Sequence, residues 1–387
     1  MTRVSILGVT GSIGQSTLEV LKALGGREAF EVVAITGASD IEGLARAAKA
    51  TGAAIAVTAH EARLDDLKDA LAGCETKAAA GVGALLDAAR IPVDWTMAAI
   101  VGAAGLAPTL AAAEAGGVIG LANKECLVSA GGLFLREAGR AGATVIPVDS
   151  EHSAIFQCID RMAGPPSKFI LTASGGPFRD WPLEKMASVT PEIARAHPNF
   201  DMGLKISIDS ATLFNKALEM LEARWLFGAT TETLDVVVHP QSIVHSAVGY
   251  PDGAVIAQLG APDMKTAIGY ALTYPERGAL PVAPLDLVAL ARLDFEAPAE
   301  TRFPAIRLAR QAMTESELTG AALNAAKECA LDAFIAGKIS FLEMSEIVEA
   351  VLESLTPAPH ARDVEDVYEM DAAARRAALS EMRRRAS

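Results

Sequence analysis

The first part of the chain alternates short apolar, β-branched runs with stretches of helical periodicity. Six such runs are expected to form strands, at residues 4–7, 32–35, 55–57, 98–101, 118–121 and 144–148. Continuous apolar runs joined by helices are typical of a parallel sheet that is covered on both faces. The pattern therefore predicts a doubly wound α/β domain over residues 1–149.

After residue 149 the pattern changes. Apolar runs at residues 168–172, 235–238, 243–248 and 254–259 indicate a second, separate sheet. The Pro251-Asp252-Gly253 sequence is a turn signal, so the last two runs are expected to pair as an antiparallel hairpin. We predict a central α+β domain over residues 150–273.

The remainder of the chain is expected to be a linker followed by helices. Prolines at positions 275, 281, 284, 298 and 304 predict an extended linker over residues 274–303. Residues 304–387 then show helical periodicity and predict a C-terminal helical bundle. Ser340 and Glu343 have the spacing of a capping box, and an apolar stripe, expected to be core, follows at Phe341, Met344, Val348, Val351 and Leu355.

Composition narrows the class of protein. The 387 residues are 51% hydrophobic and 21% charged, which indicates a globular chain, and the net charge of −14 argues against general nucleic-acid binding.

The apolar run at residues 97–122 is rich in Ala and Gly and is broken by Gly116-Gly117, so strand, helix and strand are expected there and no membrane span. Met1 leads directly into a predicted strand, so no signal peptide is expected. Four scattered cysteines, none in a CxxC pair, suit reduced thiols, and a cytoplasmic location is expected.

A glycine-rich turn follows the first predicted strand. Gly8, Gly11 and Gly14 are spaced as GxxGxxG, and the third glycine opens a helix. Bare glycine backbone at a helix N-terminus can accept a pyrophosphate, with Thr10 and Ser12 as further donors. A tight strand–helix turn without a ligand is the alternative, but the continuing βα alternation favours a Rossmann-like dinucleotide site.

The end of the second strand is where such a fold meets the adenosine ribose. Here the chain offers Gly37, Ser39 and Asp40, with no Arg or Lys beside them in the sequence. An acid favours a free 2′-hydroxyl, so this segment alone leans towards NAD. Asp40 fits equally well as the N-cap of a helix that begins at Ile41.

Two acids follow the sixth predicted strand. A strand places residues i and i+2 on one face, so Asp149 and Glu151 are expected to point together. Paired carboxylates repel unless a cation or a proton lies between them, which predicts a divalent cation. Lys124 follows the strand at residues 118–121 and is expected at the same sheet edge, facing substrate oxygens; a solvated lysine is the alternative.

A second group of polar residues lies at 207–219, in a segment that predicts a long helix ending near Gly228. Asn215, Lys216 and Glu219 share one helical face, and Ser210 lies about one turn earlier. This face could simply be exposed to solvent. Alternatively, Glu219 is a third oxygen ligand of the cation, and Ser210, Asn215 and Lys216 surround a phosphate.

Two loops complete the candidate site. Ser174, followed by two glycines, has the flexible backbone of an anion nest. His197 lies in a loop rich in Pro and Gly that is expected to act as a lid. Three carboxylates at Asp149, Glu151 and Glu219 fit Mg²⁺ or Mn²⁺, and no His/Cys set has the spacing of a zinc site.

Six sequence motifs, in this order, resemble those of one known family. They are Val-Thr-Gly-Ser-Ile-Gly at 9–14, Ala-Asn-Lys-Glu at 122–125, Pro-Val-Asp-Ser-Glu-His at 147–152, Thr-Ala-Ser-Gly-Gly-Pro-Phe at 172–178, His-Pro-Asn at 197–199 and Ser-Ala-Thr-Leu-Phe-Asn-Lys-Ala-Leu-Glu at 210–219. Together they are similar to the 1-deoxy-D-xylulose 5-phosphate reductoisomerases of the non-mevalonate isoprenoid pathway. The likeness extends over nearly the whole chain.

The resemblance implies a homodimer that uses NADPH and one divalent cation, Mg²⁺ or Mn²⁺, to convert this sugar phosphate into 2-C-methyl-D-erythritol 4-phosphate. It implies cation ligands at Asp149, Glu151 and Glu219, and phosphate contacts from Ser174, His197, Ser210, Asn215 and Lys216. It places Ser150 and Lys124 at the substrate hydroxyls and carbonyl. It also implies cofactor contacts from Thr10, Gly11, Ser12, Ile13, Gly37, Ser39, Asp40, Asn123, Glu125, Met202 and Gly203, and a flap at about residues 195–205.

The chain departs from the family pattern at a few positions. Many members have Gly, then Lys or Arg, then Asn where this chain has Ala38, Ser39 and Asp40, and Trp is common where Phe200 stands. Two other functions remain open on the residues alone. One is another NAD(P)-dependent dehydrogenase of a small phosphorylated or semialdehyde substrate; the other is a catalytically silent binding protein on the same fold.

Overall fold

The structure is a computed structural model that describes residues 1–160, 164–195 and 203–386. The chain divides into two units, each formed by several segments of the sequence. Unit 1 comprises Met1–Cys126, Phe134–Phe156 and Asp263–Pro284, and unit 2 comprises Leu127–Leu133, Gln157–Pro262 and Leu285–Ser387. The domain boundaries expected at residues 149, 273 and 303 stay a prediction about which parts fold independently.

A seven-stranded parallel sheet forms the centre of unit 1. Its strands are β1 (Thr2–Leu7), β2 (Phe30–Gly37), β3 (Ile55–Thr58), β4 (Lys77–Ala80), β5 (Trp95–Ala98), β6 (Val118–Leu121) and β7 (Thr144–Pro147). They lie in the order β4-β3-β2-β1-β5-β6-β7, so the strand order reverses between β1 and β5. This is the doubly wound arrangement expected from the sequence, and ligands bind such sheets at the reversal point.

Two strands of this sheet differ from the prediction. The strand expected at residues 98–101 lies three residues earlier, as β5 at Trp95–Ala98. Trp95 belongs to this strand because its side chain is buried in the core, where its indole N–H donates to the Ala271 carbonyl at 3.0 Å. Val101, by contrast, is 85% exposed. Strand β4 was not predicted, since three of its four residues are alanines with weak strand preference.

Helices connect the strands of unit 1. They are α1 (Ser12–Ala23), α2 (Ile41–Thr51), α3 (Leu64–Ala70), α4 (Gly81–Ala89), α5 (Leu106–Glu114), α6 (Glu125–Val128), α7 (Gly131–Arg140), α8 (Ser150–Cys158) and α13 (Lys265–Thr273), with short 3₁₀ turns at Gly26–Glu28, Glu61–Arg63 and Ala103–Gly105. The run at residues 97–122 is strand, helix and strand, as expected. Within the described residues, no helix is both long and apolar enough to cross a membrane.

A four-stranded sheet forms part of unit 2. Its strands are β8 (Lys168–Ala173), β9 (Leu234–Val238), β10 (Val244–Gly249) and β11 (Val255–Leu259), in the order β11-β10-β8-β9. Strands β10 and β11 are antiparallel, and the Tyr250 N–H donates to the Ala254 carbonyl across the turn at 2.9 Å. The predicted hairpin is therefore confirmed.

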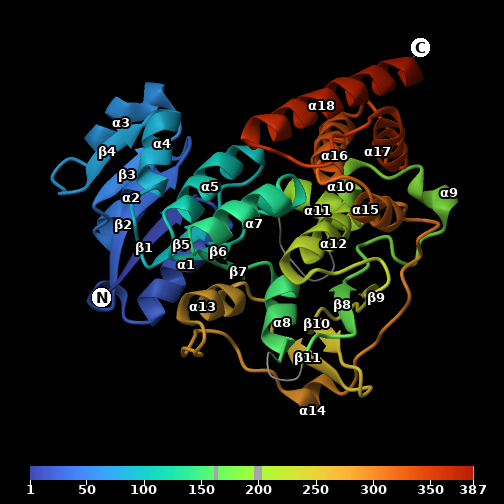
Figure 1. The fold of residues 1–387 in the computed structure, drawn as a ribbon, viewed down its shortest axis with the longest axis horizontal. Coiled ribbons are helices and arrows are strands. Elements are labelled where there is room, and N and C mark those ends of the chain that lie inside the picture. The colour runs from blue at the N-terminus through green and yellow to red at the C-terminus, as the bar shows by residue number, and fades with distance from the viewer. Residues whose placement is uncertain (161–163, 196–202, 387) are drawn as a thin grey trace. The chain divides into compact units, whose positions relative to one another are not determined.

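The helices of unit 2 are α9 (Leu183–Met186), α10 (Pro191–Ala194), α11 (Leu204–Ala211), α12 (Phe214–Phe227), α14 (Leu287–Leu290), α15 (Ala305–Thr314), α16 (Thr319–Ile335), α17 (Glu343–Ser354) and α18 (Val364–Ala386). Helices α16, α17 and α18 pack together as the expected C-terminal bundle (Figure 1). The apolar stripe is buried at Phe341, Met344, Val348 and Val351, but Leu355 lies beyond the end of α17 and is half-buried.

Two helix starts differ from the prediction. Helix α17 begins at Glu343, whose carboxylate accepts the Ser340 backbone N–H at 2.7 Å, so this half of the capping box is present. The helix predicted from residue 207 to Gly228 is broken in two. Leu213 adopts φ 60°, and the Thr212 hydroxyl accepts the Phe214 N–H at 3.5 Å, so α11 stops and α12 starts afresh.

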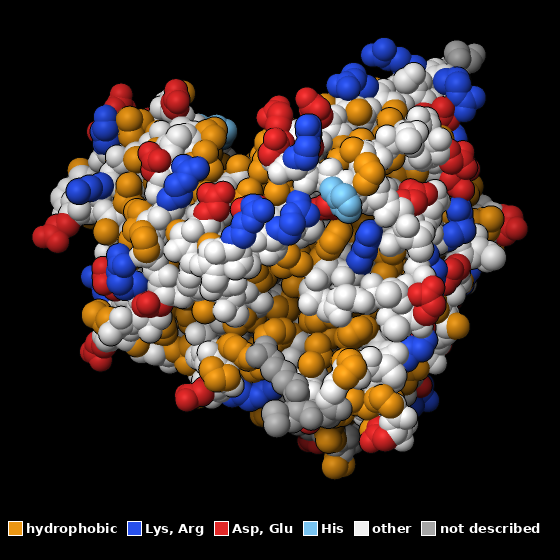
Figure 2. Space-filling view, viewed as in Figure 1, with side chains coloured by type: hydrophobic (Ala, Val, Ile, Leu, Met, Phe, Trp, Pro, Cys, Tyr) orange, Lys and Arg blue, Asp and Glu red, His pale blue; other side chains and the backbone are white. Residues whose placement is uncertain are grey.

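The surface carries both signs of charge. On the face drawn in Figure 2, acidic and basic side chains lie interspersed. Exposed apolar side chains are present on the edge strand β11, where Val255 is 60% and Ile256 44% exposed. None of the four cysteines, all of them among the described residues, is in a disulfide.

Candidate active site

The glycine turn after β1 requires glycine for steric reasons. Gly8 has φ 91°, and a Cβ there would lie 2.6 Å from the Ala99 carbonyl oxygen. A Cβ at Gly14 would lie 2.4 Å from the Gly8 carbonyl oxygen, so the first turn of α1 packs directly on the loop. Gly11, the N-cap of α1, and Ser12 are exposed. Together they form a helix N-terminus suited to a pyrophosphate, at the point where the strand order reverses.

The loop after β2 lies next to this turn. A Cβ at Gly37 would lie 3.3 Å from the Thr10 side chain. Asp40 is the N-cap of α2 and accepts the Gly43 N–H at 2.9 Å, which confirms the capping alternative. Arg63 donates from Nη1 to the Ser39 carbonyl at 3.3 Å. Sequence reasoning missed this arginine because 24 residues separate it from Ser39; only the parallel pairing of β2 and β3 brings the two together.

Lys124 is held at the end of β6 by its neighbour. The Asn123 amide donates to the Ile100 carbonyl at 2.5 Å and to the Gly102 carbonyl at 3.1 Å, and its oxygen accepts the Cys126 N–H at 2.9 Å. These bonds fix the backbone on both sides of Lys124. The Lys124 ammonium then donates to Asp149 at 2.5 Å. The solvated-lysine alternative is wrong, because the Lys124 side chain is only 17% exposed.

Asp149 and Glu151 converge for a different reason from the one predicted. Strand β7 ends at Pro147 and α8 begins at Ser150, so the two acids do not lie on a strand. Asp149 instead accepts the N–H groups of Glu151 at 3.2 Å and His152 at 3.4 Å, as a helix N-cap does. One carboxylate oxygen of Asp149 still lies within 4.8 Å of one from Glu151. Ser150 donates its hydroxyl to Glu151 at 2.5 Å.

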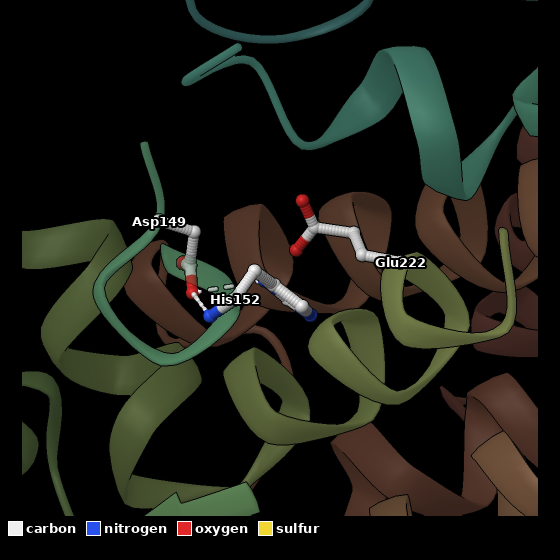
Figure 3. A group of neighbouring side chains, drawn as sticks. All are labelled: Asp149, His152 and Glu222. Carbon is white, nitrogen blue, oxygen red and sulfur yellow. Dashed lines mark hydrogen bonds and ion pairs between the residues drawn. The ribbon is translucent and has the colours of Figure 1, made fainter. Parts of the chain in front are cut away.

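The electrostatics around Asp149 favour its charged form. Burial would raise its pKa, but the charges of Lys124 and His152, with their hydrogen bonds, hold the pKa well below the usual 3.8. His152 Nδ1 lies 3.0 Å from the Asp149 carboxylate, and Figure 3 draws this ion pair with a dashed line. The figure also draws Glu222, which comes from α12. Sequence reasoning did not single out His152; its position three residues after Asp149, at a helix start, was the available signal.

In unit 2 the loop after β8 contacts α11. Gly175 and Gly176 have φ 82° and 67°, and the Gly176 N–H donates to the Ser174 hydroxyl at 3.2 Å. A Cβ at Gly176 would lie 2.9 Å from the Ser210 carbonyl oxygen. The two glycines therefore allow the Ser174 loop to pack on the end of α11, where Ser210 lies. Backbone in this conformation can form an anion nest.

On α12, three polar side chains interact as their spacing predicted. Asn215 donates its amide to Glu219, and the Lys216 ammonium forms an ion pair with the other oxygen of that carboxylate. Lys216 is 3% exposed and Glu219 is fully buried. The solvent-exposed alternative is therefore wrong for this helix face. Buried charges are costly unless they are paired, and here Lys216 and Glu219 pair with each other.

The other candidate residues have simpler outcomes. Ile13 is half-buried in the first turn of α1, Glu125 is the first residue of α6, and Gly203 is exposed and precedes α11. His197 and Met202 lie outside the described residues.

The donor chemistry of the acids fits a small, hard cation. Asp149 is ionised, and its carboxylate oxygen lies close to that of Glu151. Glu219 is buried, and its carboxylate contacts an ammonium group. Oxygen ligands of this kind suit Mg²⁺ or Mn²⁺, with positions left for substrate or water.

Nearly the whole chain matches models of one protein family. Residues 4–131 match 1-deoxy-D-xylulose 5-phosphate reductoisomerase, residues 145–227 match the C-terminal domain of 1-deoxy-D-xylulose 5-phosphate reductoisomerase, and residues 259–377 match the DXP reductoisomerase C-terminal domain. The chain is 61% identical over 377 residues to the enzyme of that name from Rhizobium rhizogenes, covering 97% of this chain and 95% of the relative. It is 58% identical over 382 residues to that of Rhizobium meliloti, covering 98% of both.

Solved structures agree with the sequence relatives. The chain is similar to the Zymomonas mobilis 1-deoxy-D-xylulose 5-phosphate reductoisomerase in complex with NADPH, with a TM-score of 0.93 and 47% identity over 98% of both chains. It is equally similar in fold to a DOX-P reductoisomerase in complex with NADPH, fosmidomycin and magnesium, with a TM-score of 0.93 and 40% identity over 99% of this chain and 98% of the other.

Proposed function

The chain belongs to the 1-deoxy-D-xylulose 5-phosphate reductoisomerase family, and from that premise we propose how its residues divide the work of the reaction. The protein converts 1-deoxy-D-xylulose 5-phosphate into 2-C-methyl-D-erythritol 4-phosphate, with NADPH as the reductant and a divalent cation as cofactor. The lean towards NAD taken from residues 37–40 alone is wrong. The rival dehydrogenase and the silent binding protein do not account for this family membership.

We propose that Asp149, Glu151 and Glu219 hold the cation. The ionised state of Asp149, its closeness to Glu151 and the buried carboxylate of Glu219 support this set. When bound, the cation polarises the carbonyl and the adjacent hydroxyl of the substrate, and NADPH supplies the hydride.

The phosphate group of the substrate is bound, in this proposal, by residues of unit 2. Ser174 contributes its hydroxyl and the nest of backbone N–H groups that follows it, and Ser210 lies against that nest. Asn215 and Lys216 contribute an amide and an ammonium, and His197 is the fifth member of the set. Because Lys216 and Asn215 also contact Glu219, one face of α12 carries members of both the phosphate set and the cation set. Binding of the remote phosphate would hold the flexible substrate in reacting geometry.

Lys124 and Ser150 are proposed to face the hydroxyls and carbonyl of the substrate. Lys124 is positioned for this by Asn123, which fixes the backbone of its loop. A buried ammonium donates hydrogen bonds to oxygens on which negative charge develops, and it stabilises that charge more strongly than water would.

The cofactor site is proposed to lie at the reversal point of the sheet. Thr10, Gly11, Ser12 and Ile13 bind the pyrophosphate, Gly37, Ser39 and Asp40 line the ribose end, and Asn123, Glu125, Met202 and Gly203 lie towards the nicotinamide. The flap expected at about residues 195–205, most of which lie outside the described residues, would exclude water from the reacting groups.

We further propose a cytoplasmic homodimer that accepts Mn²⁺ as well as Mg²⁺. Reduced cysteines support the compartment. The exposed apolar side chains on the edge strand β11 support self-association, since such a strand is a ready surface for a partner. Oxygen-only ligands accommodate either cation.

One observation supports this division of work most directly: within a single sheet, the carboxyl ends of β1, β6 and β7 present the glycine turn, Lys124 and Asp149.

The test is an assay with deoxyxylulose phosphate, NADPH and Mn²⁺, following loss of the reduced cofactor and identifying the product by NMR. Oxidation of NADPH that is abolished by EDTA and restored by Mn²⁺ is expected. Oxidation that persists without a cation would contradict the cation set.

A further inference from the structure

NADPH differs from NADH only by a phosphate on the 2′-hydroxyl of the adenosine ribose. In a doubly wound fold that ribose lies at the end of the second strand, and an arginine nearby can accommodate the phosphate. The residues that follow β2 here are Ala38, Ser39 and Asp40, all of them exposed. None is basic, so a cation that recognises the phosphate must come from elsewhere in the chain.

Hydrogen bonds join the end of β2 and the loop after it to the end of β3 and the residues that follow. The Ala59 N–H donates to the Gly37 carbonyl at 2.9 Å, and the Thr58 hydroxyl donates to the Ala38 carbonyl at 2.7 Å. Arg63, in the 3₁₀ turn at Glu61–Arg63, donates to the Ser39 carbonyl at 3.3 Å. Three successive carbonyls are thus bonded to one neighbouring segment, which holds the Arg63 guanidinium beside Ser39.

The acid in this loop is occupied elsewhere. One Asp40 oxygen accepts the Gly43 N–H, and a Cβ at Gly43 would lie 2.1 Å from the other oxygen. The Asp40 carboxylate is therefore directed at the first turn of α2. In this role it stabilises the helix, as N-cap carboxylates do.

Arg63 has donors to spare. A guanidinium has five N–H donors, and the bond to Ser39 uses one of them. A second, from Nε, goes to Asp66 at 2.5 Å, in an ion pair whose side chains are 41% and 58% exposed. An exposed pair of this kind contributes little and exchanges readily for a better partner. A phosphate dianion, which can accept two parallel bonds from the fork, is such a partner.

We propose that Arg63 binds the 2′-phosphate of NADPH, together with the hydroxyl of Ser39, and thereby selects NADPH over NADH. The inference rests on NADPH being the cofactor and adds the residue that recognises its extra phosphate. Arg63 is a specificity residue in this proposal and takes no part in the chemical step.

The test measures cofactor binding without turnover. Titration calorimetry on the full-length protein gives the Kd of NADPH and of NADH for the wild type and for Arg63→Ala. Loss of a charge-assisted pair of hydrogen bonds should raise the Kd of NADPH by about 10- to 100-fold. The Kd of NADH should change less than about twofold, because that cofactor has no 2′-phosphate. Arg63→Lys, which keeps the charge but loses the fork, should fall between the two.

Arg46→Ala is the matched control. Arg46 lies on α2 in the same unit and pairs with Glu42 on the surface, so its removal changes the net charge equally without touching the loop. Its NADPH affinity should stay at the wild-type value. A second variant, Asp66→Asn, removes the carboxylate that competes for Arg63 and should tighten NADPH, but not NADH, by a few fold.

Each outcome decides the matter. If Arg63→Ala weakens both cofactors equally, or neither, or if wild type binds both equally well, the assignment of Arg63 is overturned. If the wild type binds NADH but no NADPH, the cofactor assignment itself fails, which is a distinct result.

Discussion

At the scale of single residues, the charge balance around Asp149 decides the chemistry. Burial would raise the pKa of the Asp149 carboxylate, but the charges and hydrogen bonds of Lys124 and His152 hold that pKa well below its usual value. The same carboxylate caps α8 through two backbone N–H groups. Helix capping, ion pairing and proposed cation binding thus converge on one side chain.

Lys124→Met tests the role given to this ammonium. Removing a donor aimed at developing charge should lower kcat by about 10²-fold or more, while the Kd of NADPH changes little. Steady-state kinetics with deoxyxylulose phosphate supply the rate, and calorimetry supplies the Kd. Lys22→Met, which removes an exposed lysine from α1, is the control and should keep wild-type activity. If Lys124→Met retains more than half of the wild-type kcat, the role is refuted.

Residue-level prediction from the sequence succeeded where the partners are close along the chain. Asn215, Lys216 and Glu219 were placed together by helical spacing, and they do interact. Asp149 and Glu151 were found for the wrong reason, since a helix start rather than a strand brings them together. Arg63 was missed because its neighbour Ser39 lies 24 residues away, and only strand pairing reveals that contact.

At the scale of elements, helix α11 is anchored to the C-terminal bundle by a buried ion pair. Lys327 of α16 donates to Asp209 of α11 at 2.9 Å, and the two side chains are 6% and 11% exposed. Asp209 directly precedes Ser210, the proposed phosphate ligand. The ion pair with the C-terminal bundle therefore helps to fix the position of Ser210 within unit 2.

Lys327→Met tests this anchor. It leaves an uncompensated buried carboxylate and should destabilise the protein by about 3–5 kcal/mol, as measured by urea unfolding followed by circular dichroism. The double variant Lys327→Met/Asp209→Leu replaces both charges and should recover most of that loss. A single variant as stable as the wild type would show that the ion pair does not hold α11.

The end of α18 should make stability depend on pH in a defined direction. Hydrogen bonds from Arg384 and Arg385 lower the pKa of Glu381 from 4.5 to about 2. A depressed carboxyl pKa stabilises the folded state above about pH 4.5, and this contribution disappears as the pH falls towards about 2. Thermal unfolding of the wild type and Glu381→Gln should therefore differ most at neutral pH. The difference should vanish near pH 2; a difference that grows on acidification would be the opposite of this expectation.

Helices and strands were predicted best where the helical pattern spans several turns or an apolar run is uninterrupted. The hairpin at β10 and β11 was predicted from two apolar runs joined by a turn signal, and the stripe on α17 from helical spacing. Strand β4 was missed because alanine carries almost no strand signal. The break between α11 and α12 was missed because Leu213 adopts a left-handed conformation there. Leucine rarely adopts this conformation, so the sequence gives no signal for it.

At the scale of the whole molecule, each of the two units is built from three separate segments of the chain. Residues Asp263–Pro284 return to unit 1, where α13 packs against α1. The proline spacing that predicted a linker from residue 274 is a local signal, so it could not reveal this return. Buried residues such as Ile268 make α13 part of the unit 1 core.

Ile256→Glu tests the proposed homodimer. Light scattering coupled to size exclusion should give the wild type twice the 40.2 kDa of one chain. A charge on the exposed edge strand β11 should lower the measured mass at micromolar concentration. Val82→Glu, which alters another exposed apolar residue, is the control and should remain dimeric. A monomeric wild type would refute the proposal.

The central claim is that Asp149, Glu151 and Glu219 hold one divalent cation. Anomalous diffraction from crystals soaked in Mn²⁺ tests it most directly. We expect a single strong peak per chain with oxygens of all three carboxylates about 2 Å away, the distance typical of small hard cations. A peak bound by other residues, or one from which the Glu219 carboxylate is absent, would contradict it.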